Sequence, residues 1–118
     1  FSGAGSQAIL ANLPPHQIKS LYLTNAAQIS QAGLGESWKD FRTALAEIRK
    51  QGFAQTIGKI NPGMHSVAVP IIRPDGKVAG SLLMIGPAVQ ADMQDAVSLV
   101  PALQAKSDQI AVSMNVSE

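Results

Sequence analysis

Residues 63–87, with the sequence GMHSVAVPIIRPDGKVAGSLLMIGP, decide the fold that we expect for this chain. Two apolar runs of strand length flank Pro74-Asp75-Gly76, where proline presets φ and glycine accepts a positive φ. This pattern predicts a β-hairpin. Side chains alternate between the two faces of a strand, and both faces of this hairpin are mostly apolar. We therefore expect helices to cover one face and another element to cover the other.

The alternation assigns each side chain of the hairpin to a face. In the first strand one face carries Val67, Val69 and Ile71, and the other carries Ser66, Ala68, Pro70 and Ile72. In the second strand one face carries Val78, Gly80, Leu82 and Met84, and the other carries Ala79, Ser81, Leu83 and Ile85. Ser66 is a small polar group at the start of an apolar floor, as is typical of small-molecule cavities. The alternative is a buried structural hairpin in which Ser66 bonds to the backbone.

Composition limits the classes of function. A chain of 118 residues forms one domain, and its net charge of +1 gives no strong field. The absence of a basic arm makes this stretch by itself a poor nucleic-acid binder. Charged residues make up 14% of the chain and hydrophobic residues 46%. Because about 25% charged residues is typical of soluble chains, we expect some apolar surface to meet a partner subunit or a missing part of the same protein.

The cysteine count and the termini add further limits. The chain has no cysteine, which excludes disulfides, thiolate nucleophiles and cysteine-ligated metals. No apolar run approaches the ~20 residues of a membrane span, and the first residues do not have the layout of a signal peptide. The sequence begins with Phe1 rather than with methionine. We therefore expect a fragment or a processed product.

The first residues, FSGAGSQ at 1–7, predict a small-residue loop that runs into a helix over residues 8–13. Glycines let the backbone come close to a ligand, and the free N–H groups at a helix start attract an anion. A plain N-terminal helix cap is the alternative. The next pattern predicts a second short helix over residues 16–23, with His16 in solvent, and a loop over residues 24–35.

Residues 37–52 give the strongest helix signal. Ser37 and Asp40 have the Ser-x-x-acid form of a helix start, and Gly52 stands where a C-cap is expected. Apolar residues recur between them at helical spacing: Trp38, Phe41, Leu45 and Ile48. This stretch therefore predicts a helix with one buried face.

The segments on either side of the hairpin predict one strand and a long helical region. Residues 53–60 indicate a strand interrupted near Gly58, with Thr56 able to point inward, and Asn61-Pro62-Gly63 indicates a turn. After the hairpin an apolar face recurs at helical spacing: Met93, Val97, Val100, Leu103, Ile110 and Met114. Pro101 predicts a kink or two helices joined there, and we expect Met93 and Met114 to fill the core.

No catalytic constellation is visible in the sequence. The chain has two histidines, His16 and His65, and eight scattered acids, without a Ser-His-Asp layout or paired carboxylates. His65 and Ser66 are adjacent, so in a strand their side chains point to opposite faces and cannot share a site without a bulge. We therefore predict that the chain is not an enzyme and that it holds no metal and no cofactor.

The order of these motifs resembles the effector-binding domain of the IclR family of bacterial transcriptional regulators. The resemblance covers essentially the whole chain, and its strongest part is IRKQGF at residues 48–53. At family spacing there follow Gly63, Ala68-Val69-Pro70, Asp75-Gly76 and Gly86-Pro87. The resemblance implies an α/β (α+β) domain over residues 1–118, with helices packed on a curved antiparallel sheet in a GAF-like architecture. It also implies that the opening strands of the domain are missing, so that the chain forms roughly its last two-thirds.

The resemblance also implies a function. Relatives are bacterial cytoplasmic repressors or activators, and a separate N-terminal winged helix-turn-helix domain reads the operator. This chain would bind a small organic acid and form a homodimer or homotetramer, would meet DNA only through the missing domain, and would not meet a membrane. The alternative is a stand-alone GAF-like sensor or interaction module without a DNA partner.

The resemblance implies seven effector-binding residues: Ala4, Gly5, Thr56, Met64, Ser66, Leu83 and Ile85. The amides of Ala4 and Gly5 would face the ligand carboxylate, or those of Gly3 and Ala4 if the glycines of the family motif are matched instead. Leu83 and Ile85 stand where relatives can have serine, and replacing hydroxyls by alkyl groups leaves a hydroxyl-rich ligand poorly satisfied. We therefore expect a fairly apolar effector, such as an aromatic or branched acid, in a closed cavity between the hairpin and a helix start.

Overall fold

The computed structural model describes residues 1–58 and 62–114. Three helices precede the sheet: α1 (Ala4–Leu10), α2 (Pro15–Gln31) and α3 (Trp38–Gln51). Three antiparallel strands follow in the order β1-β2-β3: β1 (Ala54–Ile57), β2 (Met64–Ile72) and β3 (Val78–Pro87). Two further helices come last, α4 (Gln90–Ser98) and α5 (Val100–Ser113). The predicted α+β class with an antiparallel sheet is therefore confirmed.

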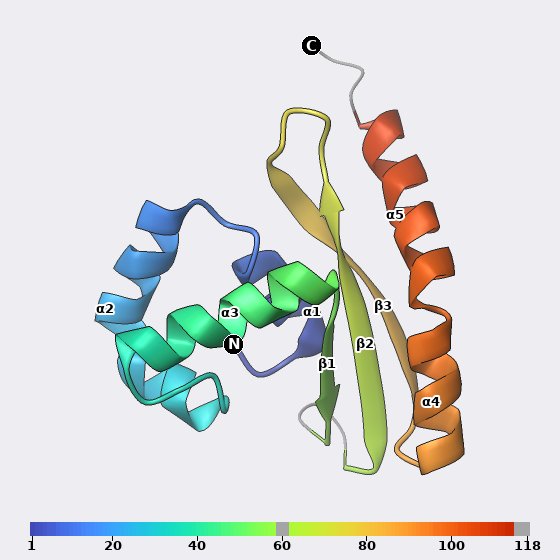
Figure 1. Cartoon of the computed structure of the whole chain (residues 1–118), viewed down its shortest axis with the longest axis horizontal. Coiled ribbons are helices and arrows are strands. Elements are labelled where there is room, and N and C mark those ends of the chain that lie inside the picture. The colour runs from blue at the N-terminus through green and yellow to red at the C-terminus, as the bar shows by residue number, and fades with distance from the viewer. Residues whose placement is uncertain (59–61, 115–118) are drawn as a thin grey trace.

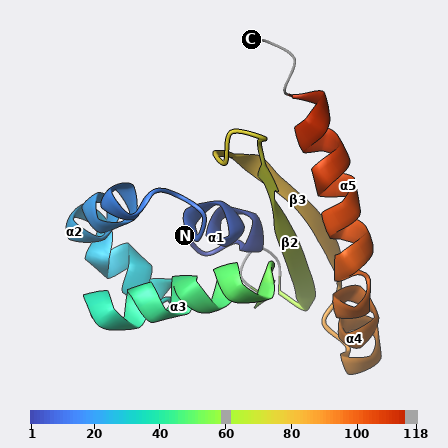
Figure 2. The same ribbon diagram turned by 45° about the horizontal axis from the view of Figure 1, so that its top comes forward.

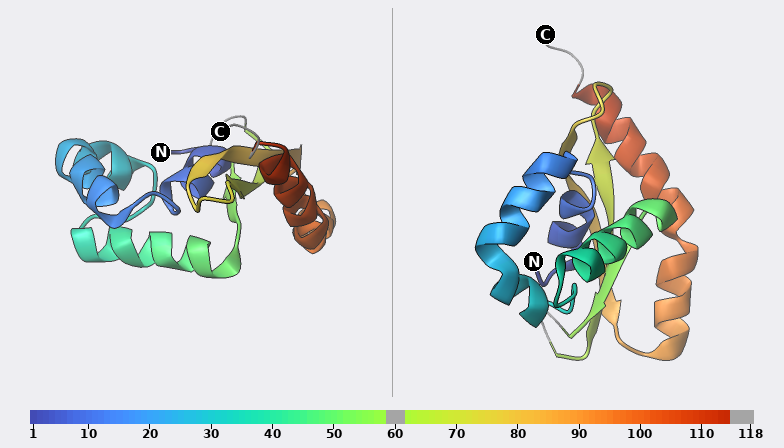
Figure 3. Two further views of the ribbon diagram at one scale, coloured as in Figure 1. Left: turned by 90° about the horizontal axis from the view of Figure 1, so that it is seen from above. Right: turned by 60° about the vertical axis from the view of Figure 1, so that its left-hand side comes forward.

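Helices cover both faces of the sheet (Figure 1). On one side α1 lies directly on the strands, and α3 and α2 lie beyond it, as the view from above in Figure 3 shows. On the other side α4 and α5 run along β2 and β3. The expectation of helices on one face only is therefore wrong. The physical reason is that β2 is apolar on both faces, so each face needs a layer that removes it from water.

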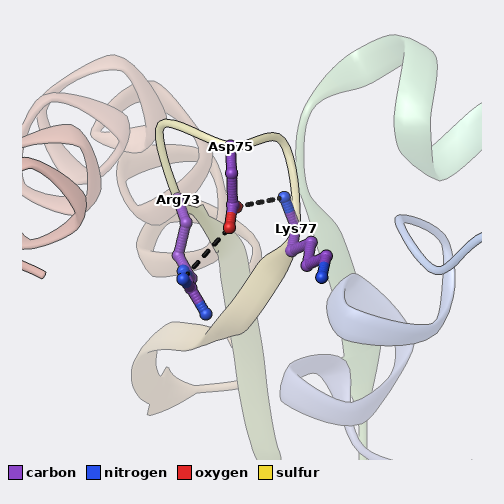
Figure 4. A network of polar contacts seen from close by, with 3 residues as sticks. All are labelled: Arg73, Asp75 and Lys77. Atoms are coloured by element: carbon purple, nitrogen blue, oxygen red, sulfur yellow. Dashed lines mark hydrogen bonds and ion pairs between the residues drawn. The ribbon is translucent and has the colours of Figure 1, made fainter. Parts of the chain in front are cut away.

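The predicted hairpin is confirmed. In the register of the strands Ser66 is opposite Ile85, Ala68 is opposite Leu83, and the pairing shifts between Ile71 and Ile72. Figure 4 shows the turn that joins the strands. There the Asp75 carboxylate accepts a bond of 3.0 Å from the backbone N–H of Lys77 and lies 3.0 Å from the Arg73 guanidinium. Gly76 has φ +87°, which a residue with a side chain rarely adopts.

Pro70 lies in the central strand, where a proline normally removes a ladder hydrogen bond. The pairing of β1 with β2 ends at Ala54 and Ala68, so beyond Ala68 the strand β2 is paired on the β3 side only. The Pro70 carbonyl accepts a bond of 2.6 Å from the hydroxyl of Ser107 on α5. The short β1 therefore makes room for the proline, and α5 satisfies its carbonyl.

The helix predicted over residues 37–52 is also confirmed. The Ser37 hydroxyl accepts the N–H of Asp40 at 3.1 Å, and Gly52 ends α3 with φ +85°. Phe41, Leu45 and Ile48 on its inner face are buried in the same core as Ala68 of β2. The N-cap and the C-cap are local signals, and for this reason the sequence was sufficient to place both ends.

Two predictions for the first helices are wrong. α1 begins at Ala4 rather than at residue 8, and α2 extends to Gln31 through a stretch that we expected to be a loop. A break at Asn25, with φ −134° and ψ 25°, divides α2, and its second part is anchored by Ile29, which is fully buried. Tertiary packing thus supports helical turns whose sequence shows no clear period. His16 is exposed, as expected.

The last region forms two joined helices rather than one kinked helix, which is one of the two alternatives predicted for Pro101. The junction is at Leu99, and Pro101 lies in the first turn of α5, where a proline is tolerated. Met114 is 43% exposed and does not fill the core. Ser107 and Ala111 are buried in its place, because small side chains let α5 approach the sheet closely. Met93 is half-buried.

Around β1 the structure tests only part of the expected pattern. β1 ends at Ile57, and Gly58 has φ +69°. Within the expected turn at 61–63, Gly63 has φ +75° while Asn61 lies outside the described residues.

Among the helices of residues 1–58 and 62–114, none is both long and apolar enough to span a membrane.

Candidate functional site

The predicted effector residues of the strands share one face of the sheet. Thr56 of β1 is paired with Ser66 of β2, and Ser66 is paired with Ile85 of β3, so the three side chains form one cross-strand row. The next row places Leu83 beside Ala68. Side chains in directly opposite positions lie about 5 Å apart, so the hydroxyls of Thr56 and Ser66 are neighbours.

The start of α1 lies over the same face. A Cβ atom added to Gly5 would stand 2.9 Å from the Oγ atom of Ser81, so only a glycine lets α1 come this close to β3. The first intrahelical bond of α1 runs from the N–H of Gln7 to the carbonyl of Gly3 at 3.0 Å. The N–H groups of Ala4 and Gly5 precede that bond and have no acceptor within the helix. The helix start thus brings two free amide donors to the face that carries the three hydroxyls.

Exposure differs along this face. Thr56 and Ser66 are buried, at 9% and 4% exposed, while Leu83 and Ile85 are 39% and 51% exposed. Met64, at the beginning of β2, is half-buried. The described residues therefore cover the hydroxyl row but leave the alkyl part of the floor open to solvent. This differs from the closed cavity that we expected, because the seven-residue α1 leaves Leu83 and Ile85 exposed.

The clearest hollows of the described residues lie away from this face. One of about 380 Å³ lies between α1, α2 and α3, and one of about 590 Å³ lies between the α1–α2 connection and the turn of the hairpin. A third, of about 540 Å³, lies between β1 and α4 and includes Gln55, whose side chain is on the opposite face of β1 from Thr56. None of these three contains a predicted effector residue.

The chemistry of the face is neutral. Its side chains are hydroxyls and alkyl groups, with no acid or base among the seven predicted residues or Ser81. A carboxylate there would be held by amide and hydroxyl donors rather than by an ion pair. Such bonds to an ionised acceptor are shorter and stronger than bonds between neutral groups.

His65 lies on the other face, as the alternation predicts. It is 1% exposed and paired in register with Ile57 of β1, and its Nε2 atom lies 2.9 Å from the Oε1 atom of Gln55. Val67, two residues further on, is buried against α4 and α5. His65 and Ser66 therefore point to opposite sides of the sheet and do not form one site.

Ser81 belongs to the candidate face but was not among the predicted effector residues. It is the β3 residue closest to Gly5, and it shares its face with Leu83 and Ile85. The alternation of the strand placed it there from the sequence. Its proximity to α1 could not be read from the sequence, because that depends on how the helix packs.

Comparison with known proteins places the chain among regulators of transcription. Residues 1–112 match the family described as bacterial transcriptional regulator IclR C-terminal. No curated protein sequence matches the chain at a significant level. Among solved structures, a putative IclR transcriptional regulator from Silicibacter sp. TM1040 is 30% identical with a TM-score of 0.69, over 88% of this chain and 41% of that chain.

Two further solved structures share the fold at lower identity. The C-terminal domain of the E. coli transcriptional regulator KdgR is 20% identical with a TM-score of 0.75, over 97% of this chain and 70% of that chain. HmgR of Pseudomonas aeruginosa is 23% identical with a TM-score of 0.67, over 94% of this chain and 44% of that chain. The chain spans about half the length of several solved structures that it matches, with 59%, 46% and 41% covered in three of them.

The fold and these matches define the class of the chain as a domain of a bacterial transcriptional regulator. More particularly, the chain belongs to the IclR family, and it corresponds to the C-terminal domain of that family.

Proposed function

We propose that this chain is the small-molecule effector-binding and oligomerisation domain of an IclR-type regulator, which controls operator binding by a separate helix-turn-helix domain in the bacterial cytoplasm. The observation that carries the proposal is the gathering of the expected residues at one face. Thr56, Ser66 and Ile85 form one row, and the start of α1 meets the same face at Ser81. The nearby hydroxyls and the helix start together support a ligand site at this face.

The groups on this face favour a small acid with an apolar body. The amides of Ala4 and Gly5, together with the nearby hydroxyls, would donate to its carboxylate. α1 has only seven residues, so the individual N–H groups matter more than a helix dipole. Leu83 and Ile85 offer alkyl surface without hydrogen-bonding groups, and this supports an aromatic or branched acid over a hydroxyl-rich one.

Binding would act on the operator through the arrangement of subunits. An effector shifts an equilibrium only when its affinity for the two arrangements differs. α5 and the residues that cap α4 and α5 include large exposed side chains that suit a subunit contact: Val89, Leu99, Val112 and Met114. A change in that contact would alter the spacing of the two helix-turn-helix domains, and with it the affinity for the two half-sites.

Calorimetric titration of the whole gene product with a panel of acids tests the ligand class. We expect aromatic and branched acids to bind more tightly than two-carbon and three-carbon oxoacids. Ser66→Ala should weaken binding about tenfold, because the hydroxyl is lost from a buried site. Ser98→Ala, on the exposed side of α4, is the matched control and should leave binding unchanged. Tight binding of the smallest hydrophilic acids alone, or full binding by the Ser66→Ala variant, would contradict the proposal.

A further inference from the structure

A groove lies between the first three helices, and its floor is apolar. It lies between the end of α1, the start of α2 and one side of α3, and its volume is about 380 Å³. Figure 2 and the right-hand view in Figure 3 show α1, α2 and α3 as neighbouring helices. Ala11, Ile18 and Leu45 form its buried part, and the half-buried Trp38 also lines it.

Trp38 is held in place by its neighbours. Its ring centroid lies 5.5 Å from that of Tyr22 and 6.1 Å from that of Phe41, and the Lys19 ammonium lies 4.4 Å from the ring centroid. An aromatic side chain fixed in this way offers contact area without a further loss of rotamer freedom on binding. The floor is therefore preorganised for an apolar partner group.

The rim of the groove is positively charged. Arg42, Arg49 and Lys50 line it, and no acid does. Within the described part of the chain, the only ion pair joins Arg73 to Asp75, so none of these three cations is neutralised by a carboxylate there. Arg49 also lines the neighbouring hollow of about 590 Å³, to which Lys77 of the hairpin contributes. The two hollows thus share Arg49, and we call the first of them, which lies along α3, the α3 groove.

The shape and charge of the α3 groove decide between possible occupants. From Trp38 to Lys50 it follows α3 over thirteen residues, and the twelve steps between them correspond to about 18 Å. The groove is open, since Pro15, Ala46 and Arg49 are exposed, whereas a metabolite site buries most of its ligand. Duplex DNA would use the cations but has no apolar group to place on Trp38 and Ile18. A peptide with acidic and apolar side chains uses both features.

We propose that the α3 groove is a docking site for an acidic amphipathic segment of a partner protein, about three helical turns long. Apolar side chains of the segment pack on Trp38, Ile18 and Ala46 in the manner of a helix in a groove. Carboxylates on its flanks pair with Arg42, Arg49 and Lys50. This site lies on the far side of α1 from the candidate effector face, so it provides a contact to other proteins that is separate from effector and operator.

Selection from a displayed library of random twelve-residue peptides tests the proposal on the whole gene product. Enriched peptides should combine Asp or Glu with aromatic or aliphatic residues spaced three and four apart. A synthetic copy of the enriched peptide should change the emission of Trp38, the single tryptophan of this chain, and 0.5 M salt should weaken its binding. The Trp38→Phe variant identifies that signal if the rest of the gene product contains further tryptophans.

Three variants make the test specific. The double variant Arg42→Glu/Arg49→Glu should weaken binding of the peptide about tenfold or more, and Ala46→Trp should abolish binding by filling the groove. Lys39→Glu changes an exposed lysine of the same helix outside the groove and should alter binding less than twofold. All these positions are exposed, and thermal unfolding checks that each variant is folded. Failure to enrich any peptide, enrichment of neutral or basic peptides, indifference to these variants, or equal binding of duplex DNA at the groove would overturn the proposal.

Discussion

The two faces of β2 carry alternate residues of the same strand, yet they are packed in different ways. Val67 and Val69 are fully buried in a cluster with Val100 of α5. On the opposite face Ser66 and Ala68 have small side chains, and the neighbouring Leu83 on β3 is 39% exposed. One face is thus a sealed core between a sheet and two helices, and the other is covered over only part of its area.

Side-chain size explains the difference. Large β-branched residues on one face fill the space between the sheet and α4–α5, and the buried polar groups of that face, His65 and Ser107, are hydrogen-bonded to Gln55 and to the Pro70 carbonyl. Small residues on the other face, together with Gly5, let the backbone of α1 come close to the strands. A short helix with a glycine near its start covers less surface than two long helices. The face of small residues is therefore the one that can present backbone amides to a ligand.

The largest contrast between the faces should appear when a charge is introduced. Val69→Asp places a carboxylate in an apolar cluster and should lower the free energy of unfolding by about 3 kcal/mol or more. Leu83→Asp places the same group at a position that is 39% exposed and should cost less than about 1 kcal/mol. Urea unfolding of both variants measures the difference. Costs within about 0.5 kcal/mol of each other would show that the two faces are equally well packed.

A smaller effect is expected where the sealed face joins α5 to the sheet. Ser107→Ala removes the buried donor that bonds the Pro70 carbonyl at 2.6 Å, and it should cost about 1–2 kcal/mol because a part-buried acceptor loses its partner. Ser113→Ala is the matched control on the same helix, since its hydroxyl bonds only to the exposed turn at Ile110. It should cost less than about 0.5 kcal/mol. Equal losses in thermal and urea unfolding would remove the special role of Ser107.

The close approach of α1 to β3 can be measured by a double-mutant cycle. Gly5→Ala should lower stability by about 1 kcal/mol, because the new methyl group meets the hydroxyl of Ser81. Adding Ser81→Ala removes the clashing oxygen, so the pair should show a coupling of about 1 kcal/mol. Gly80→Ala, at a position with no neighbouring atom within 4 Å, serves as the control and should show no coupling with Ser81→Ala. Additive effects of the first pair would mean that α1 can move away from β3 without loss.

The smallest effect on stability is expected at the open end of the same face. Ile85 is 51% exposed, so Ile85→Ser should change the free energy of unfolding by less than about 1 kcal/mol. The new hydroxyl stands beside Ser66 in the cross-strand row and should shift binding from apolar acids toward hydroxylated ones. Calorimetric titration of both kinds of acid measures this shift. An unchanged preference would place the effector away from this row.

The sequence predicted the elements that depend on local signals. The turn at Asp75-Gly76 and the caps Ser37 and Gly52 each place a backbone hydrogen bond or a positive φ, and these positions are as expected. The start of α1 and the second part of α2 depend on tertiary packing instead. Gly5 is helical against β3, and the stretch around Ile29 is helical because that side chain is buried in the core.

The candidate site shows the same division. Alternation along one strand was enough to put Ser81, Leu83 and Ile85 on one face of β3, because the side-chain period of a strand is two residues. That Thr56 and Ser66 share this face depends on the register between the strands, and only the family resemblance implied it. Ser81 as the contact of α1, and the exposure of Leu83, could not be predicted in this way. Both depend on how far a helix reaches across a sheet. The sequence pattern of one strand does not predict that distance. The role of these residues in effector binding stays a prediction.

The lengths of the two outer strands have a consequence for how the sheet can grow. β1 offers an edge of only four residues, and the missing N–H of Pro70 interrupts the donors of β2 beyond the end of β1. β3 is the longer edge strand, Val78–Pro87, and its one proline is its last residue, on the opposite edge of the described sheet. Long, flat edges recruit further strands, and short or proline-bearing ones resist this. Addition of a strand to this sheet, by self-association or by another segment, is therefore directed to the β3 side.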